Sequence, residues 1–309
     1  MQKNLTIGII GGGLMGHGIA LVMARAGQQV AITDPMPEAR DALPGRVRES
    51  MALMGHDERS ISETVSRITV HETLEGAVKN AFAVFEAAPE KMALKQEIFA
   101  RIEAAAPRDC ILASNTSVMP ITQIMQGLTH RDRALGTHWW NPPHMIPLVE
   151  VIRTEWTRTA TMDSMVALLA DAGKTPVKVE KDVPGFIGNR LQHALWREAV
   201  SLVERGICDA ESVDLVVKSC FGRRLSVLGP LENADLVGTD LTLDIHNTVL
   251  ADLESRQGPS PYLEKLVSDG KLGMKSGEGF RQWTPEEATR VRNRVTTHLR
   301  KLEGLLNDD

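Results

Sequence analysis

A histidine and a glutamate in segment 136–151 have the types and the spacing of a proton-transfer pair. His138 follows the apolar run Arg133-Ala-Leu-Gly-Thr, Glu150 follows Met145-Ile-Pro-Leu-Val, and the two stand twelve positions apart. Each run is typical of a strand, and the Pro-Pro turn between them would bring two strands side by side. A carboxylate on one imidazole nitrogen fixes the tautomer and raises the basicity of the other nitrogen. The segment therefore predicts His138 as a general base that Glu150 orients.

The same residues allow two other kinds of site. His138, His144 and Glu150 could supply three ligands to a metal ion, but the helical H-E-x-x-H pattern is absent, and we expect no metal. Ser117, His138 and Glu150 have the residue types of a hydrolase triad, but the chain has no G-x-S-x-G nucleophile elbow. Proton abstraction by His138 is the favoured chemistry.

A glycine-rich turn near the start of the chain could bring a hydride acceptor to this base. It fits G-x-G-x-x-G between an expected strand and an expected helix, and Asp34 follows eighteen residues after Gly16 at the end of a second strand. The turn would bind a pyrophosphate, and Asp34 would accept hydrogen bonds from the adenosine ribose and repel a 2′-phosphate, which favours NAD. The alternatives are a turn required by packing and a solvated acid. The predicted contacts of the turn are Gly11, Gly13, Leu14, Met15 and Gly16.

The elements around these motifs alternate between strand and helix up to residue 180. Such alternation predicts an α/β fold with a Rossmann-type, doubly wound parallel sheet. Beyond 182–185 the apolar positions recur only at helical spacing, which predicts an all-helical C-terminal domain. We expect an NAD-binding domain at 1–183 and a helical domain for substrate binding and dimerisation at 184–309. The expected strands are 5–10, 29–34, 68–70, 82–87, 111–114, 133–138, 145–150 and 176–180, and the expected helices are 14–26, 38–54, 91–105, 159–172, 187–203, 212–219 and 234–253.

Composition limits the partners. The 309-residue chain is 42% hydrophobic and has a net charge of −5, so it can build ordinary cores and lacks the basic field of a nucleic-acid or membrane partner. The expected partner is a small molecule. Cys110, Cys208 and Cys220 form no C-x-x-C pair, and glycines interrupt the apolar run 5–24. Both features predict a cytoplasmic protein without disulfides or a membrane segment.

Taken in order, these motifs make the chain resemble the 3-hydroxyacyl-CoA dehydrogenase family over nearly its whole length. They are the glycine turn, Ala88-Pro-Glu-Lys-Met-Ala-Leu-Lys-Gln-Glu, Ala113-Ser-Asn-Thr-Ser, the His138 segment, Pro184-Gly-Phe-Ile-Gly-Asn-Arg and Lys275-Ser-Gly-Glu-Gly-Phe. The resemblance implies a dehydrogenase in which His138 takes the hydroxyl proton as hydride leaves for NAD, and it implies a homodimer formed by the helical half.

The resemblance also implies roles for five further residues. Ser117 and Asn189 match residues that hydrogen-bond the reacting oxygen, whereas Glu90, Lys95 and Asn115 match positions around the nicotinamide-side ribose. Each has a structural alternative. Ser117 could cap a helix that begins near 118, Asn189 could cap or brace the interdomain helix, and Lys95 could be a solvated lysine on an exposed helix face.

Three departures from the acyl-CoA pattern bear on the substrate. Trp139 and Trp140 follow the histidine where phenylalanines are usual, and one of the pair is expected to be core filler. In acyl-CoA members the helix around residues 46–48 carries lysines that suit the phosphates of CoA, whereas this chain has Arg46 and Arg48 there. The two arginines could replace the lysines, or they could be solvated charges on the helix surface.

The third departure is the turn 222–230, which is longer than the family's and carries Arg223 and Arg224. These features lean toward the branch of L-gulonate 3-dehydrogenase and hydroxy-methylpyridine-carboxylate dehydrogenase. An arginine of this turn that reaches the active site could bind the carboxylate of a small free acid through two hydrogen bonds. The alternative is that both arginines are exposed loop charges. We therefore expect oxidation of a small hydroxy-carboxylate. The alternatives are 3-hydroxybutyryl-CoA or another acyl-CoA, L-carnitine, and a non-catalytic, crystallin-like NAD-binding protein.

Overall fold

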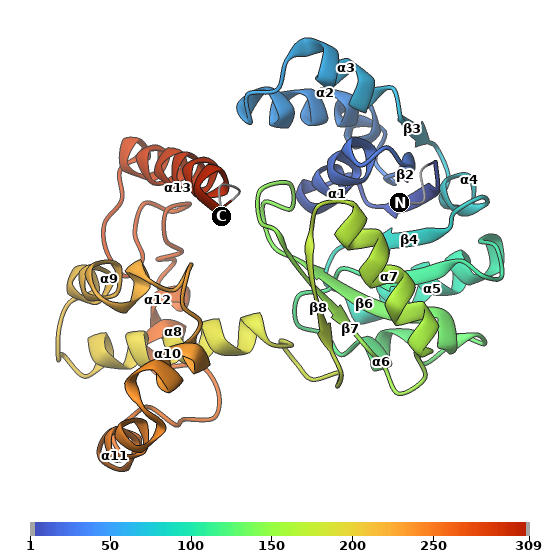
Figure 1. The fold of residues 1–309 in the computed structure, drawn as a ribbon. Helices are drawn as coiled ribbons and strands as arrows, with labels where there is room; N and C mark the ends of the chain where they lie inside the picture. Colours follow the sequence, from blue (N-terminus) through green and yellow to red (C-terminus); the bar gives the residue numbers. More distant parts are fainter. Residues whose placement is uncertain (1–3, 307–309) are drawn as a thin grey trace. The chain divides into compact units, whose positions relative to one another are not determined.

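A computed structural model describes residues 4–306 of the chain. The chain divides into two compact units, one that reaches to Arg190 and includes the chain from Leu299, and one that runs from Leu191 to His298. The boundary predicted between 183 and 184 lies slightly before this division, in the segment that leads into helix α8 (Gly188–Glu204). Figure 1 shows the course of the chain.

The first unit contains an eight-stranded sheet with the order β3-β2-β1-β4-β5-β6-β7-β8. The first six strands run parallel, β6 and β7 pair antiparallel, and β8 runs parallel to β7. The Rossmann-type sheet is confirmed, with its last two strands reversed. The strands are β1 (Thr6–Ile10), β2 (Gln29–Thr33), β3 (Ile68–His71), β4 (Ala83–Glu86), β5 (Ile111–Ser114), β6 (Ala134–Trp139), β7 (Leu148–Ile152) and β8 (Thr175–Val179).

Helices cover both faces of this sheet (Figure 1). One core packs α1, α2, α3 and α7 against it, and the other packs α4, α5 and α6. Strand residues alternate between the two, so that Ile7 and Ile9 enter the first core and Ile10 the second. Four helices were expected, and the short α3, α4 and α6 were not. The helices are α1 (Leu14–Arg25), α2 (Pro37–Leu53), α3 (Glu58–Val65), α4 (Leu74–Val78), α5 (Met92–Ala105), α6 (Ile121–Met125) and α7 (Thr159–Asp171), with a 3₁₀ turn η1 (Arg131–Arg133).

In the rest of the described chain the regular elements are helices, apart from isolated β-bridges between Gly273 and Glu278 and between Glu278 and Gln282. One expected helix, 234–253, is in fact two, because Gly238 with φ of 103° ends α10 and begins α11. A left-handed residue cannot continue an α-helix, and glycine adopts that conformation at little cost. The helices are α8 (Gly188–Glu204), α9 (Ala210–Ser219), α10 (Pro230–Val237), α11 (Thr239–Val249), α12 (Pro261–Ser268) and α13 (Pro285–Leu306), with a 3₁₀ turn η2 (Phe221–Arg223).

Candidate active site

The predicted histidine–glutamate pair forms in the sheet itself. His138 and Glu150 are directly opposite each other in the antiparallel pair β6–β7. Nδ1 of His138 lies 2.7 Å from Oε2 of Glu150, and the two side chains are 4% and 1% exposed. With Nδ1–H donating to the carboxylate, the other ring nitrogen, Nε2, is left free to accept a proton. The geometry is that of a base held by a buried acid.

Glu150 also accepts hydrogen bonds from two backbone N–H groups. Its Oε1 accepts the backbone N–H groups of Ile187 at 2.8 Å and Gly188 at 3.0 Å, at the start of α8. Burial opposes ionisation of this carboxyl group, but the hydrogen bonds from His138, Gly188 and Ile187 outweigh it, and the pKa of Glu150 is lowered. Glu150 is therefore a carboxylate at neutral pH.

Strand alternation separates the two tryptophans. His138 points to the face of the sheet where Phe186 lies, with ring centroids 5.6 Å apart, whereas Trp139 points to the opposite face and meets the edge of Phe85. Trp139 is core filler, which corrects its prediction as a substrate contact. Trp140 follows the end of the strand, and its ring lies 5.0 Å from that of His138. Its indole N–H is buried and has no partner among the described residues.

Ser117 and Asn189 are brought together from distant parts of the chain. The side-chain amide of Asn189 donates to the backbone carbonyl of Ser117 at 2.8 Å, so Asn189 braces the loop after β5. The alternative that Ser117 caps a helix is wrong, because α6 begins only at Ile121 and has no side-chain cap. Asn115, on the same loop, accepts the Trp139 N–H at the end of β6. These contacts fix the loop beside the strand that carries His138.

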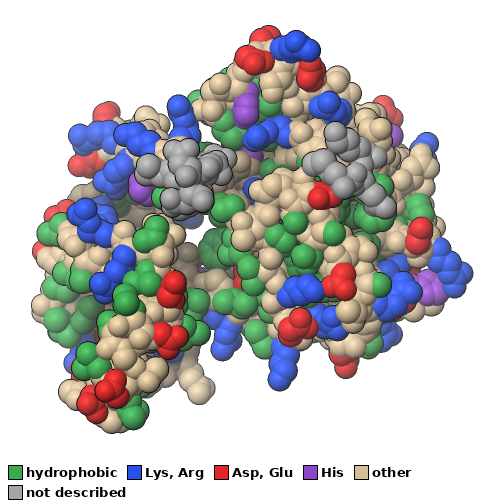
Figure 2. Space-filling view, viewed as in Figure 1, with side chains coloured by type: hydrophobic (Ala, Val, Ile, Leu, Met, Phe, Trp, Pro, Cys, Tyr) green, Lys and Arg blue, Asp and Glu red, His purple; other side chains and the backbone are tan. Residues whose placement is uncertain are grey.

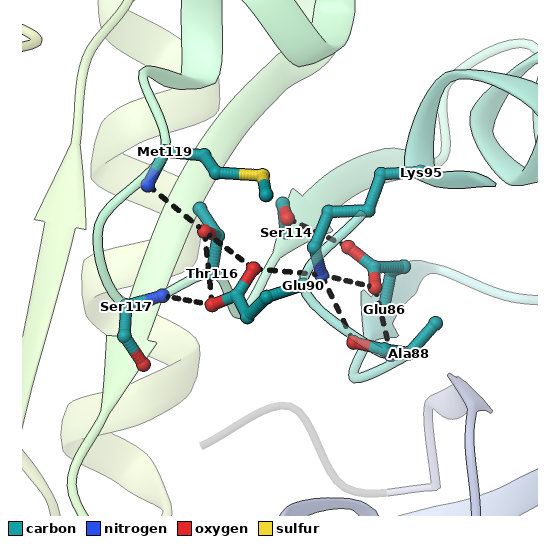
Figure 3. Close-up of polar contacts among 8 residues, drawn as sticks. All are labelled: Glu86, Ala88, Glu90, Lys95, Ser114, Thr116, Ser117 and Met119. Carbon is teal, nitrogen blue, oxygen red and sulfur yellow. Dashed lines mark hydrogen bonds and ion pairs between the residues drawn. The ribbon is translucent and has the colours of Figure 1, made fainter. Parts of the chain in front are cut away.

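Lys95 lies in a buried ion pair. It is fully buried, so it is not a solvated lysine, and its Nζ donates to Glu86 Oε1 at 2.7 Å and to the Ala88 carbonyl at 3.1 Å. The ammonium group of Lys95 is thus bound by the protein itself, and its predicted contact with the ribose stays a prediction. Glu90 is 40% exposed, with Oε2 3.6 Å from Lys95 Nζ (Figure 3). Of the two charged side chains, only that of Glu90 is exposed.

The glycine turn fits a dinucleotide. A Cβ on Gly16 would lie 1.7 Å from the Gly11 carbonyl oxygen, so the close approach of helix and turn requires glycine there. Gly13 is exposed with open space around its Cα, and no side chain caps the start of α1 among the described residues. The N–H groups of the first helical turn, which include those of Leu14 and Met15, and the helix dipole suit a pyrophosphate.

Asp34 lies beside this turn. Its Oδ2 accepts the Gly12 N–H at 2.8 Å and its Oδ1 accepts the Met36 N–H at 3.0 Å, so it is part of the turn rather than an independent solvated acid. Each oxygen keeps a lone pair for a ribose hydroxyl. Arg46 donates to the Gly12 carbonyl and Arg48 pairs with Glu58, so both arginines already have partners.

Other predicted residues lie elsewhere. Arg223 and Arg224 are exposed and belong to the second unit, so their role stays a prediction. His144 lies beside His17 with ring centroids 6.2 Å apart. Within residues 4–306, no group of three or more His, Cys, Asp or Glu side chains is arranged to hold a metal ion, and no helix there has the length and apolar content to cross a membrane.

Sequence reasoning missed Glu86 and Thr116, which connect Lys95 to the site. Glu86 ends a strand whose other residues are apolar, and a buried acid requires a partner. That signal was present in the sequence. Nothing local indicates that Lys95, nine residues further on, is the partner.

Family models decide the class of the protein. The model of the 3-hydroxyacyl-CoA dehydrogenase NAD-binding domain matches residues 6–183, and that of the family's C-terminal domain matches 185–283. The chain belongs to the 3-hydroxyacyl-CoA dehydrogenase family. It is an NAD-dependent oxidoreductase with a small-molecule substrate, which excludes the hydrolase and the non-catalytic interpretations.

Individual relatives of this dehydrogenase differ in what they act on. The 5-formyl-3-hydroxy-2-methylpyridine 4-carboxylate 5-dehydrogenase of Mesorhizobium japonicum is 38% identical over 96% of this chain and 98% of its own. A probable 3-hydroxybutyryl-CoA dehydrogenase of Bacillus subtilis is also 38% identical, over 88% and 95%. A crystal structure of a 5-formyl-3-hydroxy-2-methylpyridine 4-carboxylic acid 5-dehydrogenase, described as an NAD⁺-dependent dismutase, has a TM-score of 0.91, 35% identity and 99% coverage of both chains.

Proposed function

We propose that this dehydrogenase oxidises a small hydroxy-carboxylate with NAD, using His138 as the base and Glu150 as its orienting acid. The observation that carries the proposal is the 2.7 Å hydrogen bond between His138 Nδ1 and Glu150 Oε2, at opposed positions of two strands. NAD, when bound, would supply the hydride acceptor. Nε2 of His138 takes the proton of the substrate hydroxyl, and the ionised Glu150 stabilises the imidazolium that results.

Ser117 and Asn189 complete the proposed site. They would hold the reacting oxygen with short neutral donors, which favour the charge that develops on it. Their mutual hydrogen bond supports a common location. Gly11, Gly13, Gly16 and Asp34 would bind the pyrophosphate and the adenosine ribose, and Glu90 and Asn115 would lie nearer the nicotinamide side.

Three features support a free acid over a CoA thioester. Arg46 and Arg48 are engaged by Gly12 and Glu58, so the cations available for CoA phosphates are reduced. Trp140 lies against His138 and narrows the approach to it. The Mesorhizobium relative acts on a pyridine carboxylate by name. A formyl group suits the same base, because its hydrate presents an H–C–O–H group like that of an alcohol.

Two alternatives are less well supported. The Bacillus relative is named for a CoA thioester, which keeps 3-hydroxybutyryl-CoA as the second candidate. L-Carnitine would need an aromatic face for its quaternary ammonium, and with Trp139 in the core only Trp140 of the pair is left for it.

A substrate screen tests the proposal. NADH absorbance would be followed with acetoacetyl-CoA, L-gulonate, carnitine, 3-hydroxybutyrate, and hydroxymethyl- and formyl-pyridine carboxylates. We expect a free carboxylate, a pyridine carboxylate first of all, to have the highest kcat/KM. Efficient turnover of the thioester alone would overturn the substrate class while leaving the base in place.

Substitutions test the residues. His138→Ala should lower kcat by about 10²–10⁴-fold and leave the Kd for NAD within about twofold, because the base acts only in the chemical step. Undiminished turnover would refute the base. Arg223→Ala and Arg224→Ala, made separately, should raise KM at least about tenfold if that arginine binds the substrate carboxylate, and leave it unchanged if it is a loop charge.

We also propose that the protein is a cytoplasmic homodimer formed through its helical unit. Of residues 191–298, only Ser201, Leu266 and Ala288 are buried, and α9, α10 and α11 contain no buried residue. Figure 2 shows hydrophobic side chains at the surface of this unit on the face in view. Apolar exposure on this scale is unusual for a monomer, and a second copy would cover it. The free cysteines, with the pKa of Cys110 raised by burial to about 12, suit a reducing compartment.

A further inference from the structure

We propose that Lys95 is a positioning residue that acts through Glu90 to fix Ser117. The inference rests on the proposed function, which places Ser117 at the reacting oxygen, and it assigns the buried lysine a role that requires no contact with the cofactor. Figure 3 shows the contacts that connect the two residues, from α5 through the loop after β4 to the loop after β5.

The first link is a fully buried ion pair. Lys95 and Glu86 are each 0% exposed and 2.7 Å apart, and no other ion pair between described residues is buried so completely. Glu86 also accepts the Ala88 N–H at 2.7 Å and the Ser114 hydroxyl at 2.6 Å. Burying two charges costs about as much as their attraction returns, so such a pair adds little net stability. What it supplies is a fixed geometry at the ends of the adjacent strands β4 and β5.

The second link runs from Lys95 to Glu90. Nζ of Lys95 donates to the Ala88 carbonyl at 3.1 Å and lies 3.6 Å from Glu90 Oε2. The loop between β4 and α5 is thus held at its backbone and at its acidic side chain. Because Glu90 is 40% exposed, solvent alone would leave it free among rotamers. The buried ammonium favours the rotamer that faces it.

The third link runs from Glu90 to Ser117. Oε1 of Glu90 accepts the Ser117 N–H at 2.7 Å, and both carboxylate oxygens accept the Thr116 hydroxyl, at 3.1 and 2.9 Å. Thr116 in turn accepts the Met119 N–H. Asn189 holds the Ser117 carbonyl from the other side. The backbone of Ser117 is therefore fixed at both ends, and its hydroxyl points away from Glu90 in Figure 3.

A double-mutant cycle tests whether Lys95 acts through Ser117. We would measure kcat, KM and the Kd for NAD in Lys95→Met, Ser117→Ala and the combined variant, with a pyridine carboxylate as substrate, or with acetoacetyl-CoA if only the thioester is turned over. Lys95→Met should lower kcat about tenfold in the wild-type background and less than about twofold once Ser117 is already alanine, because coupled residues are non-additive. The Kd for NAD should stay within about twofold.

Three results would overturn the inference, and they are distinguishable. Equal losses of kcat in both backgrounds mean that Lys95 acts independently of Ser117, although the proposed function stands. A rise in the Kd for NAD without a fall in kcat means that Lys95 serves the cofactor instead. An unchanged kcat in Ser117→Ala removes the proposed role of Ser117 itself, and this inference with it.

Three further variants control for loss of folding and for specificity. If Lys95→Met does not fold, the neutral pair Glu86→Gln with Lys95→Met replaces it in the same cycle, with the same expected coupling. Glu103→Gln is a matched control: Glu103 also lies on α5, and its carboxylate accepts the backbone N–H groups of Thr129 and His130 in a loop. It should change Tm without changing kcat, whereas Glu90→Gln should lower kcat in a manner that depends on Ser117. Equal losses of kcat in Glu103→Gln and Glu90→Gln would also refute the positioning role.

Discussion

At His138 and Glu150, two short-range rules were sufficient to predict a contact. Side chains of a strand alternate with period two, and two strands joined by a short turn pair directly, so the spacing alone allowed the 2.7 Å hydrogen bond. The same period decides which tryptophan enters the core. Lys95 could not be predicted in this way, since its burial depends on Glu86, an acid at the end of a strand on the far side of a loop.

Glu150→Gln should remove the charge that stabilises the imidazolium. Glutamine can accept from His138 through its amide oxygen only with its amide nitrogen turned toward the Ile187 and Gly188 N–H groups, which also weakens the hold on the imidazole. We therefore expect kcat to fall by about 10–10³-fold with the KM for NAD nearly unchanged. Steady-state kinetics would show this. The conservative variant Glu150→Asp, which keeps the charge but shortens the side chain, should lose less; a glutamine variant as active as wild type would contradict the orienting role.

At the scale of elements, the expectation of a parallel sheet conflicted with the expectation of a short turn between the strands of His138 and Glu150. A parallel sheet requires long crossovers, yet β6 and β7 are joined by the short segment 140–147. So short a connection permits only an antiparallel neighbour, and the final two strands are reversed. The short helices α3, α4 and α6 were missed because five to eight residues are too few for a helical period to be visible.

The segment 140–147 should make the protein sensitive to acid. Burial, with the positive charges of neighbouring groups, lowers the pKa of His144 from 6.5 to about 4, and burial also lowers that of His17 beside it. Unfolded His144 binds a proton below pH 6.5 and folded His144 does not, so its contribution to stability is complete above pH 6.5 and is lost as the pH falls toward 4.

We therefore expect the Tm of the wild type to fall more steeply between pH 6.5 and 4 than that of His144→Gln, by about 2–4 °C over the range. Differential scanning calorimetry across this range would show it. Above pH 7 the difference between the two Tm values should be constant. Identical slopes would mean that His144 titrates in the folded protein as it does in the unfolded chain.

The start of α8 is packed against the aromatic ring next to the base. A Cβ on Gly188 would lie 2.4 Å from the Trp140 ring, so Gly188→Ala must displace the indole or the helix. We expect a loss of about 1–3 kcal/mol in the free energy of unfolding, measured by urea denaturation, together with an altered KM for the substrate. Gly127→Ala is the matched control, because a Cβ at Gly127 would meet open space. It should leave KM unchanged. Gly206→Ala is unsuitable, because the positive φ of 66° at Gly206 would strain an alanine.

At the scale of the whole molecule, the helical unit of residues 191–298 could be predicted from its periodicity, but the small number of its buried residues could not. Apolar spacing shows that a helix has an apolar face, and it does not show what covers that face. In the sheet unit the covering elements are part of the same chain, as the two cores show.

The proposed dimer makes stability depend on concentration. Size-exclusion chromatography with light scattering should give about twice the chain mass of 33.9 kDa, and Tm should rise with protein concentration. Leu231→Glu with Leu236→Glu, at positions 81% and 72% exposed in the single chain, should give a monomer of lower Tm. Leu53→Glu, at a position 62% exposed on the sheet unit, is the control that should remain dimeric. A monomeric wild type at micromolar concentration would refute the proposal.

The last strand of the sheet has a consequence for crowded solutions. β8 is an edge strand, and such edges can recruit strands from other molecules into growing sheets. Here Pro176 has no N–H to offer, and Lys178 carries a charge that is paired with Asp163 on α7. Both devices discourage addition of another strand. Addition of a strand from another molecule at the β8 edge should therefore be disfavoured even where the dimer forms.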